Sequence, residues 1–515
     1  MIRAYAVSSV REAEAAAAAA GLEESELMSR AAAGVAQVAS ARLGGPGGRR
    51  VVAVVGAGNN GGDALYAVAS LARDGATAVV LTVAQSVHEG GLRAAREAGA
   101  VVLNAVGAPG DLASVVSSTL HEADLVIDGI VGIGGRPGLS PQIEALLLEV
   151  SDTAYVLAVD LPSGTDPDGE VATQSSVFAD ETVTFIAAKP VHLLPATEPA
   201  VGRLTVLDIG VKIGRQPVVE RVTADDVSWL WPQPGPADDK YSRGVLGIVA
   251  GGEKYTGAAL LAVTSAVCSG AGMVRYVGPP TPTLLIRSQV PEAVIGEGQV
   301  QAWLIGPGVD VGEESAPGRE QRAAAQSALD SGLPCVVDAG GLDLIIEPRT
   351  TPTLLTPHAG ELATLLSRLV GNPIAVDRAA VASAPLAHAR RLADLTNSTV
   401  LLKGATTLVV SPGSSGLAVR SQADAPPWLA TAGSGDVLAG LAGTLLASGL
   451  SPQDCGSVAA LVHGLAGDAG NPGGPVRALG VAHAIPGVVA ALMVPPGRST
   501  LRDLNHDGRD RSVGC

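Results

Sequence analysis

Short apolar runs alternate with longer helical stretches through most of this 515-residue chain, and this alternation constrains the fold more than any other feature. Residues 49–56, RRVVAVVG, are predicted to form a buried strand, followed by a Gly/Asn turn and a helix through Arg73. The 65 glycines and the 2% aromatic content favour buried parallel strands with helices packed closely on them. We therefore predict right-handed β-α-β units and parallel sheets.

This alternation occurs twice along the chain. In the first half, further strands are expected at 78–83, 101–105, 125–128, 155–160, 181–185 and 204–208. A stretch rich in Pro, Asp and Trp over 211–239 interrupts the pattern. It then restarts, with strands expected at 245–250, 302–305, 335–338 and 400–403 and helices at 257–270 and 436–450. We predict two α/β domains, 1–215 and 239–497, joined by a linker over 216–238 and followed by a polar tail over 498–515.

Charge and cysteine content exclude several classes of protein. The formal net charge of −16 argues against a surface that binds the phosphate backbone of nucleic acids, although local backbone donors can still bind a nucleotide. The four cysteines are widely separated in the sequence: Cys268, Cys335, Cys455 and Cys515. This spacing predicts neither a disulfide framework nor a zinc site and fits a reducing cytoplasm. Residues 478–497 are uncharged but contain His483 and three prolines, so we predict a buried helix and turn, not a membrane span.

Polar or glycine-rich segments follow three predicted strands of the first half. Residues 56–63, GAGNNGGD, open a helix whose free amides favour an anion, while the Asn and Asp side chains suit hydroxyls, a ribose or a hard cation. Asp128 and Asp160 begin the other two segments, and because ligands bind beyond the carboxyl ends of parallel strands, all three segments are expected to converge. Each could instead be an ordinary turn or cap. Lys189 is a candidate for proton transfer, or a solvated surface lysine.

The second half contains the strongest motif, AGSGD at 432–436, which opens a helix. Its amides and the positive helix end form an anion cradle, and Asp436 would point at a hydroxyl beside that anion; the alternative is a simple N-cap. The KGATT segment at 403–407 supplies a cation and two hydroxyls that suit a nucleotide phosphate, or it forms only a hairpin turn. His358 and Glu361 lie about one helical turn apart after a predicted strand end, and we weigh a functional and a structural role equally.

Taken together, these motifs resemble two families. The first half resembles the NAD(P)H-hydrate epimerase domain, which has a Rossmann-like, three-layer α/β fold; the matching segments are 59–63, 128–137, 160–164 and Lys189. The second half is similar to the ADP-dependent NAD(P)H-hydrate dehydratase domain, which has a ribokinase-like α/β fold. Its matching segments are 251–258, 306–308, 356–361, 403–407 and 433–436. The two halves follow each other in the order of the fused bacterial repair enzymes.

The resemblance implies a bifunctional isomerase and lyase. NAD(P)H can take up water at its nicotinamide ring, which gives R and S hydrates (NADHX and NADPHX) that no longer donate a hydride. The first domain would interconvert the two hydrates with a bound potassium ion, and the second would dehydrate the S form with ADP, or ATP, and Mg²⁺. We expect these small molecules as partners, no nucleic acid or membrane, a homo-oligomer and a cytoplasmic location.

The resemblance also assigns residues in the first domain through the matched motifs. Those that would bind the hydrate are Asn59, Asn60, Gly61, Gly62, Asp63, Gly132, Ile133, Gly134, Gly135, Arg136, Pro137, Gly138 and Asp160. Asn60, Asp128 and Ser163 would bind potassium. Asp160 and Lys189 would transfer protons. Ala64 and Tyr66 depart from the family pattern, which usually has Gly and a smaller aliphatic residue there, and could narrow the pocket.

Residues of the second domain are assigned in the same way. The nucleotide would bind Lys403, Gly404, Ala405, Thr406, Thr407 and Gly435. The hydrate would contact Ala258, Gly308, His358 and Asp436, and Asp436 would activate its hydroxyl toward the phosphoryl donor. Two other interpretations fit the same motifs: a ribokinase-like small-molecule kinase, which leaves the first half unexplained, and a nucleotide-sensing protein without turnover.

Overall fold

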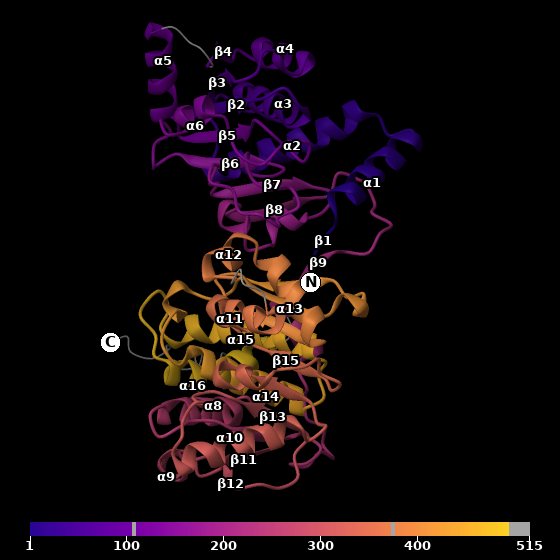
Figure 1. Ribbon diagram of the computed structural model, residues 1–515. Helices are drawn as coiled ribbons and strands as arrows, with labels where there is room; N and C mark the ends of the chain where they lie inside the picture. The colour runs from indigo at the N-terminus through magenta and orange to yellow at the C-terminus, as the bar shows by residue number, and fades with distance from the viewer. Residues whose placement is uncertain (106–109, 372–375, 494–515) are drawn as a thin grey trace, which may run out of the picture. The chain divides into compact units, whose positions relative to one another are not determined.

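The computed structural model describes residues 1–105, 110–371 and 376–493, in two compact units (Figure 1). The N-terminal unit comprises Ile2–Glu220 with Ala382–Leu386, and the C-terminal unit comprises Arg221–Val381 and the described chain from Ala387 onward. The predicted linker contains strand β9 (Val219–Arg221) and helix α7 (Ala224–Leu230). The predicted polar tail lies outside the described residues, and the domain limits stay a prediction.

The N-terminal unit is built on a seven-stranded parallel sheet with the order β4-β3-β2-β5-β6-β7-β8. The strands are β2 (Arg50–Val55), β3 (Thr77–Thr82), β4 (Val101–Asn104), β5 (Leu125–Gly129), β6 (Tyr155–Val159), β7 (Glu181–Phe185) and β8 (Arg203–Leu207). The chain starts in the middle at β2, continues outward to β4, and crosses back to β5 on the other side. This reversal between β2 and β5 leaves a crevice where open sheets bind ligands.

Helices cover both faces of this sheet. Alternate residues of β2 point to opposite sides: Val51, Ala53 and Val55 join one hydrophobic cluster, whereas Val52 and Val54 join another. The first cluster is covered by α1 (Val7–Ala19), α2 (Glu24–Leu43), α3 (Asn59–Arg73) and α4 (Glu89–Glu97); the second by α5 (Gly110–His121) and α6 (Pro141–Leu147) (Figure 1). The predicted Rossmann-like, three-layer α/β fold is confirmed.

The C-terminal unit contains a mixed sheet in which the strands follow the order β18-β17-β16-β15-β14-β13-β10-β11-β12. Their bounds are β10 (Val245–Val249), β11 (Met273–Val277), β12 (Val294–Ile295), β13 (Ala302–Ile305), β14 (Cys335–Val337), β15 (Thr353–Leu355), β16 (Thr399–Leu402), β17 (Thr407–Val410) and β18 (Val419–Gln422). Pairing is parallel from β12 through β16 and antiparallel from β16 to β18. The sequence analysis did not predict β11, β12, β17 or β18, and it indicated β15 only through the strand end before His358.

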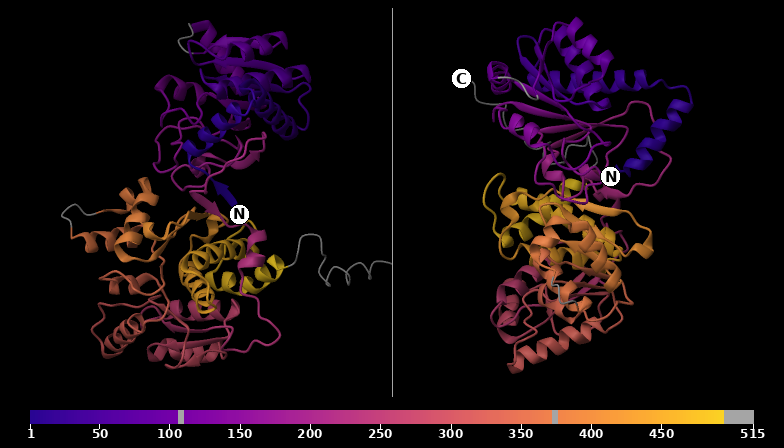
Figure 2. Two further views of the ribbon diagram at one scale, coloured as in Figure 1. Left: turned by 90° about the vertical axis from the view of Figure 1, so that its right-hand side faces the viewer. Right: turned by 45° about the horizontal axis from the view of Figure 1, so that its top comes forward.

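Helices flank this sheet as well. One large cluster buries β10 and β13 against α8 (Thr256–Cys268), α14 (Ser434–Ala447), α15 (Pro452–Gly470) and α16 (Ala478–Leu492). Figure 2 shows α15 and α16 side by side. The other helices are α9 (Pro280–Gln289), α10 (Ala316–Leu329), α11 (Ala359–Val370), α12 (Arg378–Ser383) and α13 (Pro385–Thr396), of which α10 packs on β10 and β13. The predicted ribokinase-like α/β fold is confirmed.

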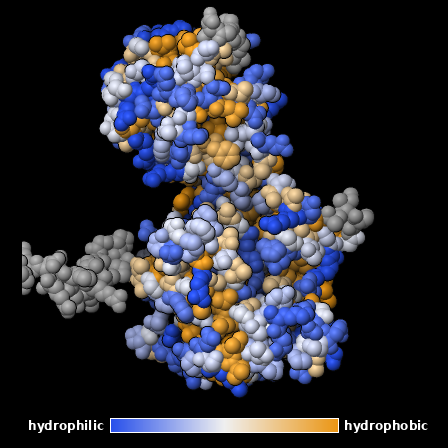
Figure 3. All heavy atoms as spheres, turned by 90° about the vertical axis from the view of Figure 1, so that its left-hand side faces the viewer, coloured by the Kyte–Doolittle hydropathy of each residue, from blue (hydrophilic) through white to orange (hydrophobic). Residues whose placement is uncertain are grey.

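Helix α16, predicted as a buried helix, accommodates Pro486 in its interior. Among the described residues, no helix is long and apolar enough to cross a membrane. On the face shown in Figure 3, hydrophobic side chains are dispersed among hydrophilic ones.

Candidate active sites

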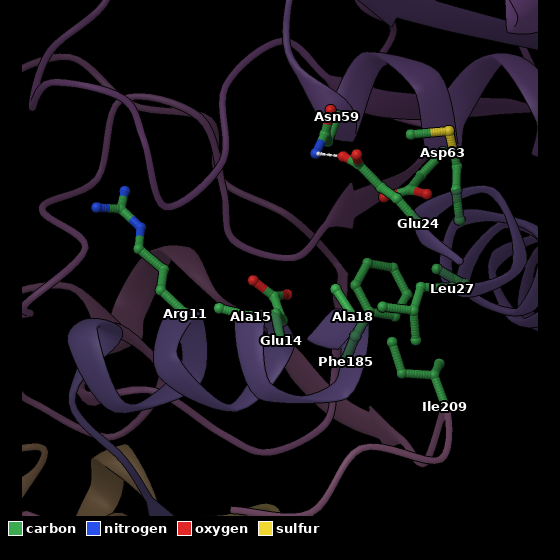
Figure 4. Close-up of a pocket in the computed structure, with 12 residues that line it drawn as sticks. Arg11, Glu14, Ala15, Ala18, Glu24, Leu27, Asn59, Asp63, Phe185 and Ile209 are labelled. Atoms are coloured by element: carbon green, nitrogen blue, oxygen red, sulfur yellow. Dashed lines mark hydrogen bonds between the residues drawn. The ribbon is translucent and has the colours of Figure 1, made fainter. Parts of the chain in front are cut away.

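Two adjoining cavities lie beside the ends of β2 and β5 in the N-terminal unit. We call the first the glycine cavity; it measures about 600 Å³ and is lined by residues 56–60 and 130–135. We call the second the carboxyl cavity; it measures about 340 Å³ and is lined in part by Glu24, Asp63 and Phe185 (Figure 4). Both cavities include Arg11, Glu14 and Asn59 in their walls. The two spaces therefore meet at the start of α3, at the reversal in strand order.

Glycines allow the two strand ends to approach each other. A Cβ atom on Gly56 would overlap the carbonyl oxygen of Ile130, and one on Gly132 would overlap the side chain of Asn60. A larger residue at position 56 would push the ends of β2 and β5 apart, and one at position 132 would displace the Asn60 side chain of α3. The amide of Asn60 is held by a 2.6 Å hydrogen bond that its Nδ2 donates to the carbonyl of Val159.

A buried polar cluster joins the β5 end to the β6 end. The Asp128 carboxylate accepts hydrogen bonds from the backbone amide of Ser163 (2.8 Å), from the Ser163 hydroxyl (2.6 Å) and from the amide of Ile130 (3.2 Å). Burial raises the pKa of Asp128 to about 6, although the Ser163 and Ile130 bonds oppose that shift. Ser163 Oγ also lies 3.3 Å from the carbonyl oxygen of Val131. The Ser163 hydroxyl proton is therefore shared between two acceptor oxygens, one of Asp128 and one of Val131.

Asp160 and Lys189 form a buried ion pair. Lys189 Nζ donates to Asp160 Oδ1 at 2.5 Å and to Thr184 Oγ1 at 2.7 Å, and the Thr184 hydroxyl in turn donates to Asp160 Oδ1 at 2.9 Å. Burial works against ionisation of Asp160, but the charge and hydrogen bond of Lys189 outweigh it and lower the pKa. Asp160 adopts a left-handed backbone with φ of 68°, a conformation that Asp and Asn tolerate.

His192 fixes the backbone around this pair, a role that sequence reasoning missed. Its Nδ1 accepts a hydrogen bond from the Lys189 amide (2.9 Å), so its Nε2 carries the proton and donates to the Asp160 carbonyl (2.7 Å). Burial, reinforced by the charge of Lys189, lowers the pKa of His192 to about 4. The imidazole is therefore neutral and orients the pair; nothing in the sequence around Lys189 indicated this.

The predicted residues of the first domain do not all reach the cavities. Those that line the glycine cavity are Asn59, Asn60, Gly132, Ile133, Gly134 and Gly135, and Asp63 lines the carboxyl cavity. Gly61 and Gly62 are buried inside α3. Absent from both linings are Arg136, Pro137, Gly138, Asp160, Lys189, Ala64 and Tyr66. The structure thus places the predicted proton-transfer pair outside the walls of the two cavities.

The carboxyl cavity also holds charged residues that the sequence analysis did not select. Arg11 and Glu14 come from α1, and Glu24 comes from α2, where it accepts a 2.9 Å hydrogen bond from Asn59 Nδ2. Glu14 lies in the alanine-rich start of the chain, where no motif marks it as a site residue. Glu14 precedes Asn59 by 45 residues in the sequence. No motif spacing connects a charged residue of an alanine-rich helix with a site that far along the chain.

In the C-terminal unit, Lys403 is the centre of a charged network. Its Nζ lies 2.8 Å from Asp338 Oδ1 and 3.6 Å from Glu361 Oε2. Thr356 Oγ1 donates to the same Asp338 oxygen at 2.8 Å. Burial alone would lower the pKa of Lys403, but Asp338 and Glu361 together raise it. Lys403 is therefore a fixed positive charge at the end of β16.

Asp436 lies within the first turn of α14 and contributes to the same electrostatic cluster. Burial raises the pKa of Asp436 to about 7, the negative charge of Asp338 adds to the shift, and the charge of Lys403 opposes it. Gly433, immediately before the helix, has φ of 87°, which favours glycine. A Cβ atom there would lie 2.5 Å from Leu261 Cδ1. The backbone turn thus sets Asp436 against α8.

A cavity of about 570 Å³ lies between the Lys403 loop and the start of α14. Predicted nucleotide residues in its wall are Lys403, Gly404, Ala405, Thr407 and Gly435, whereas Thr406 is buried and is absent from it. The loop joins the antiparallel strands β16 and β17, so it is also the hairpin that the sequence allowed as an alternative. His463 of α15, which was not predicted, belongs to the wall.

The predicted hydrate residues of this unit occupy three strand ends. His358 caps α11: its Nδ1 accepts from the Glu361 amide (3.1 Å), while its own amide donates to Glu361 (2.8 Å). His358 also lines the 570 Å³ cavity, so the structural and the functional interpretation hold together. Gly308 has φ of 66°, and a Cβ atom on it would lie 2.7 Å from that of Ala258. The ends of β10 and β13 are therefore in close contact at this point.

Comparison with known proteins agrees with this geometry. The sequence profile of the NAD(P)H-hydrate dehydratases matches residues 246–472, and that of the YjeF-related protein N-terminus matches residues 24–191. The bifunctional NAD(P)H-hydrate repair enzyme Nnr of Mycobacterium tuberculosis is 42% identical over 464 residues, which cover 87% of this chain and 89% of that protein. This chain belongs to the bifunctional NAD(P)H-hydrate repair enzymes. The predicted family and its two activities, epimerase and dehydratase, are thereby confirmed.

Other members of the bifunctional NAD(P)H-hydrate repair enzymes are similar over the same span. The protein of Mycobacterium leprae is 41% identical over 490 residues, which cover 91% of this chain and 94% of that protein. An ADP/ATP-dependent NAD(P)H-hydrate dehydratase from Bacillus subtilis, co-crystallised with ATP and Mg²⁺, is 23% identical and covers 53% of this chain and 99% of that chain, with a TM-score of 0.46.

Proposed function

We propose that this chain restores NADH and NADPH from their hydrates, with one reaction in each unit. The N-terminal unit interconverts the R and S hydrates, and the C-terminal unit dehydrates the S form at the expense of ADP. The observation that carries the proposal is Asp436, a half-buried carboxyl with a pKa of about 7 at the start of a helix and beside the Lys403 network. A group with this pKa can take a proton from a hydroxyl near neutral pH.

The arrangement of the C-terminal unit supports a phosphorylation followed by elimination. Asp436 takes the proton of the hydrate hydroxyl, whose oxygen then attacks the terminal phosphoryl group of ADP, and AMP leaves. The lone pair of the ring nitrogen expels the phosphate and forms a carbon–nitrogen double bond. Loss of a proton from the neighbouring ring carbon then restores the carbon–carbon double bond and the neutral nitrogen. The free amides at the start of α14, including that of Gly435, and Lys403 stabilise the negative charge of the nucleotide. Bound Mg²⁺ would neutralise phosphate charge.

For the N-terminal unit we propose that the hydrate occupies the glycine and carboxyl cavities. Asn59, Asn60, Asp63 and residues 132–135, which line these cavities, hold it, and the Asp160–Lys189 pair sets the charge from outside their walls. Oxygen atoms of Asn60, Asp128 and Ser163 suit a potassium ion, because amide, carboxylate and hydroxyl oxygens are the ligands that hard cations take, and Asp128 and Ser163 lie within 2.6 Å of each other. Such an ion would position the β5 and β6 ends.

The activity test uses the full chain with purified R or S hydrate of NADH, ADP and Mg²⁺, and follows the absorbance of restored NADH. We expect NADH from both hydrates, from the S form directly and from the R form after a lag. Recovery from the S form alone would contradict an active epimerase unit. No recovery, together with phosphorylation of a sugar or thiazole alcohol, would support the small-molecule kinase instead; replacing ADP by ATP decides the phosphoryl donor.

Potassium is tested by exchanging it for tetramethylammonium at constant ionic strength. We expect conversion of the R hydrate to slow by at least 10-fold, whereas dehydration of the S hydrate stays within 2-fold, because the proposed oxygen cluster belongs to the N-terminal unit alone. The Ser163→Ala variant should epimerise the R hydrate in both salts at the slow rate that the wild type shows without potassium. Equal epimerase rates in the two salts would rule the ion out.

A further inference from the structure

The carboxyl cavity holds two acidic side chains that have no partner to neutralise them. The structure shows no hydrogen bond or salt bridge between the Glu14 carboxyl and any residue in the described part of the chain. Asp63 is 6% exposed, and its Oδ1 has no hydrogen-bond partner either. A buried carboxyl oxygen without a donor costs free energy, so a ligand is the natural source of the missing bond.

The two carboxyl groups approach one space from different helices. In Figure 4 Glu14 extends from α1 toward the cavity, and Asp63 extends into it from α3 near Asn59. Glu14 also lines the glycine cavity, so it stands at the junction of the two spaces. Asp160 and Lys189, by contrast, are absent from both walls.

Charged groups around Glu14 come from every element near it. They are Arg11 on α1, Glu24 on α2, Asp63 on α3, and Asp160 and Lys189 behind the cavity. Burial raises the pKa of Glu14, the charge of Lys189 opposes the shift, and that of Asp160 adds to it. Burial likewise raises the pKa of Asp63, and the charges of Asp160 and Glu14 raise it further. Adding a proton to one carboxyl thus eases ionisation of the other.

We propose that Glu14 is a catalytic residue of the epimerase reaction, which exchanges protons with the bound hydrate opposite Asp63. This inference rests on the proposed epimerase function and goes beyond it, because it assigns the acid and the base. It gives α1, the helix at the start of the chain, a direct part in the chemistry.

The proton balance of the reaction requires such a pair. One carboxylic acid gives its proton to the ring hydroxyl, the carbon–oxygen bond breaks, and water leaves while the lone pair of the ring nitrogen forms a carbon–nitrogen double bond. Water then adds to the opposite face of the carbon, the electron pair returns to nitrogen, and a carboxylate takes the released proton. The two carboxyl groups exchange roles in the reverse direction, and no oxidant or further reactant is needed.

The test compares Glu14→Gln with a matched control, Glu12→Gln, in the full chain. Glu12 lies on the same helix but its side chain is 56% exposed and pairs with Arg215. With R hydrate as substrate, we expect kcat for epimerisation to fall at least 100-fold in E14Q with KM changed less than 3-fold, and to stay unchanged in E12Q. Dehydration of the S hydrate should be equal in all three proteins.

A second variant separates chemistry from folding. Glu14→Ala should lose epimerisation as E14Q does, and added formate should restore at least 10-fold of that loss by occupying the vacated carboxyl position. An E14Q chain that epimerises within 3-fold of the wild type would overturn the inference. An effect on KM alone would also overturn it. The same holds if formate does not rescue Glu14→Ala and the melting temperature falls, because these results would indicate a structural role. If the wild type itself converts no R hydrate, the epimerase function is what fails.

Discussion

At the scale of single residues, burial decides which carboxyl groups hold a proton near neutral pH. Desolvation raises the pKa of Asp436 to about 7 and the pKa of Asp128 to about 6. Asp160 is equally buried, yet its pKa is lowered because Lys189 lies 2.5 Å away. A carboxyl with a cationic partner therefore stays charged and serves structure, whereas one without such a partner is available to exchange a proton.

The role of Asp436 predicts a pH dependence. With saturating ADP, S-hydrate dehydration should rise between pH 6 and pH 8, because Asp436 acts as a base only after it loses its proton at a pKa of about 7. Asp436→Asn should reduce kcat by at least about 100-fold and abolish that rise. The measurement is the initial rate of NADH formation across this range; the same rise in D436N would contradict the assignment.

The Asp160–Lys189 pair predicts a pH-dependent loss of stability. Lys189→Met leaves a buried carboxylate without its cation and should cost about 3–5 kcal/mol of unfolding free energy at pH 7. Because the folded pKa of Asp160 is depressed, the pair stabilises the protein above the unfolded pKa of about 3.9, and this contribution is lost as pH falls through the folded value. Hydrogen exchange of peptides from β6 and β7 should show the lower stability of Lys189→Met. The difference from the wild type should be smaller at acidic pH. The exposed Lys212→Met should show none.

At the scale of an element, the two ends of α14 make different demands on glycine. Gly433, before the helix, is in the left-handed region and faces Leu261 of α8. Gly449, after the helix, has a similar φ of 95° but nothing within 4 Å of a Cβ atom. Both positions therefore share the backbone strain, whereas only at Gly433 would a side chain also clash with a neighbour, close to the Asp436 carboxylate.

Replacing each glycine by alanine separates strain from contact. Both variants should lose about 1–2 kcal/mol of stability, since a left-handed alanine costs that much. Only Gly433→Ala should also lower S-hydrate dehydration, by at least 10-fold, because Leu261 must shift and the start of α14 moves with it. Thermal melting and NADH formation measure the two effects; equal activity in G433A and G449A would exclude the contact as the cause.

At the scale of the whole molecule, each unit has its own sheet, core and cavities. The hydrate is a small molecule that can diffuse from one site to the other. The two reactions therefore need not occur in the same chain, and loss of one site should leave the other intact.

Complementation of full-length variants tests this independence. Asp436→Asn should still interconvert R and S hydrates without forming NADH, and Glu14→Gln should dehydrate S but not use R. An equimolar mixture of the two chains should restore NADH formation from R hydrate to at least a quarter of the wild-type rate. If the mixture forms no NADH from R hydrate although each variant keeps its single activity, the two reactions must be coupled within one chain.

Local patterns were sufficient for much of the fold. The apolar runs around Val51 and Val245 predicted central strands because buried parallel strands are apolar on both faces. Strand β11 was missed because a short apolar run and a buried helix segment have similar composition. The glycine segments at 56–63 and 432–436 were predicted as helix starts beside ligands because only glycine combines close approach with a left-handed backbone.

The sequence by itself determined the order of strands and helices and the chemistry available at the strand ends, because side-chain period and glycine freedom are local properties. Only the tertiary structure decided which groups meet: Glu14 reaches the cavity of Asp63, and Asp338 binds Lys403. It also decided which carboxyl groups are desolvated and therefore carry protons. Both outcomes depend on burial and on distances between residues far apart in the chain, which no linear pattern contains.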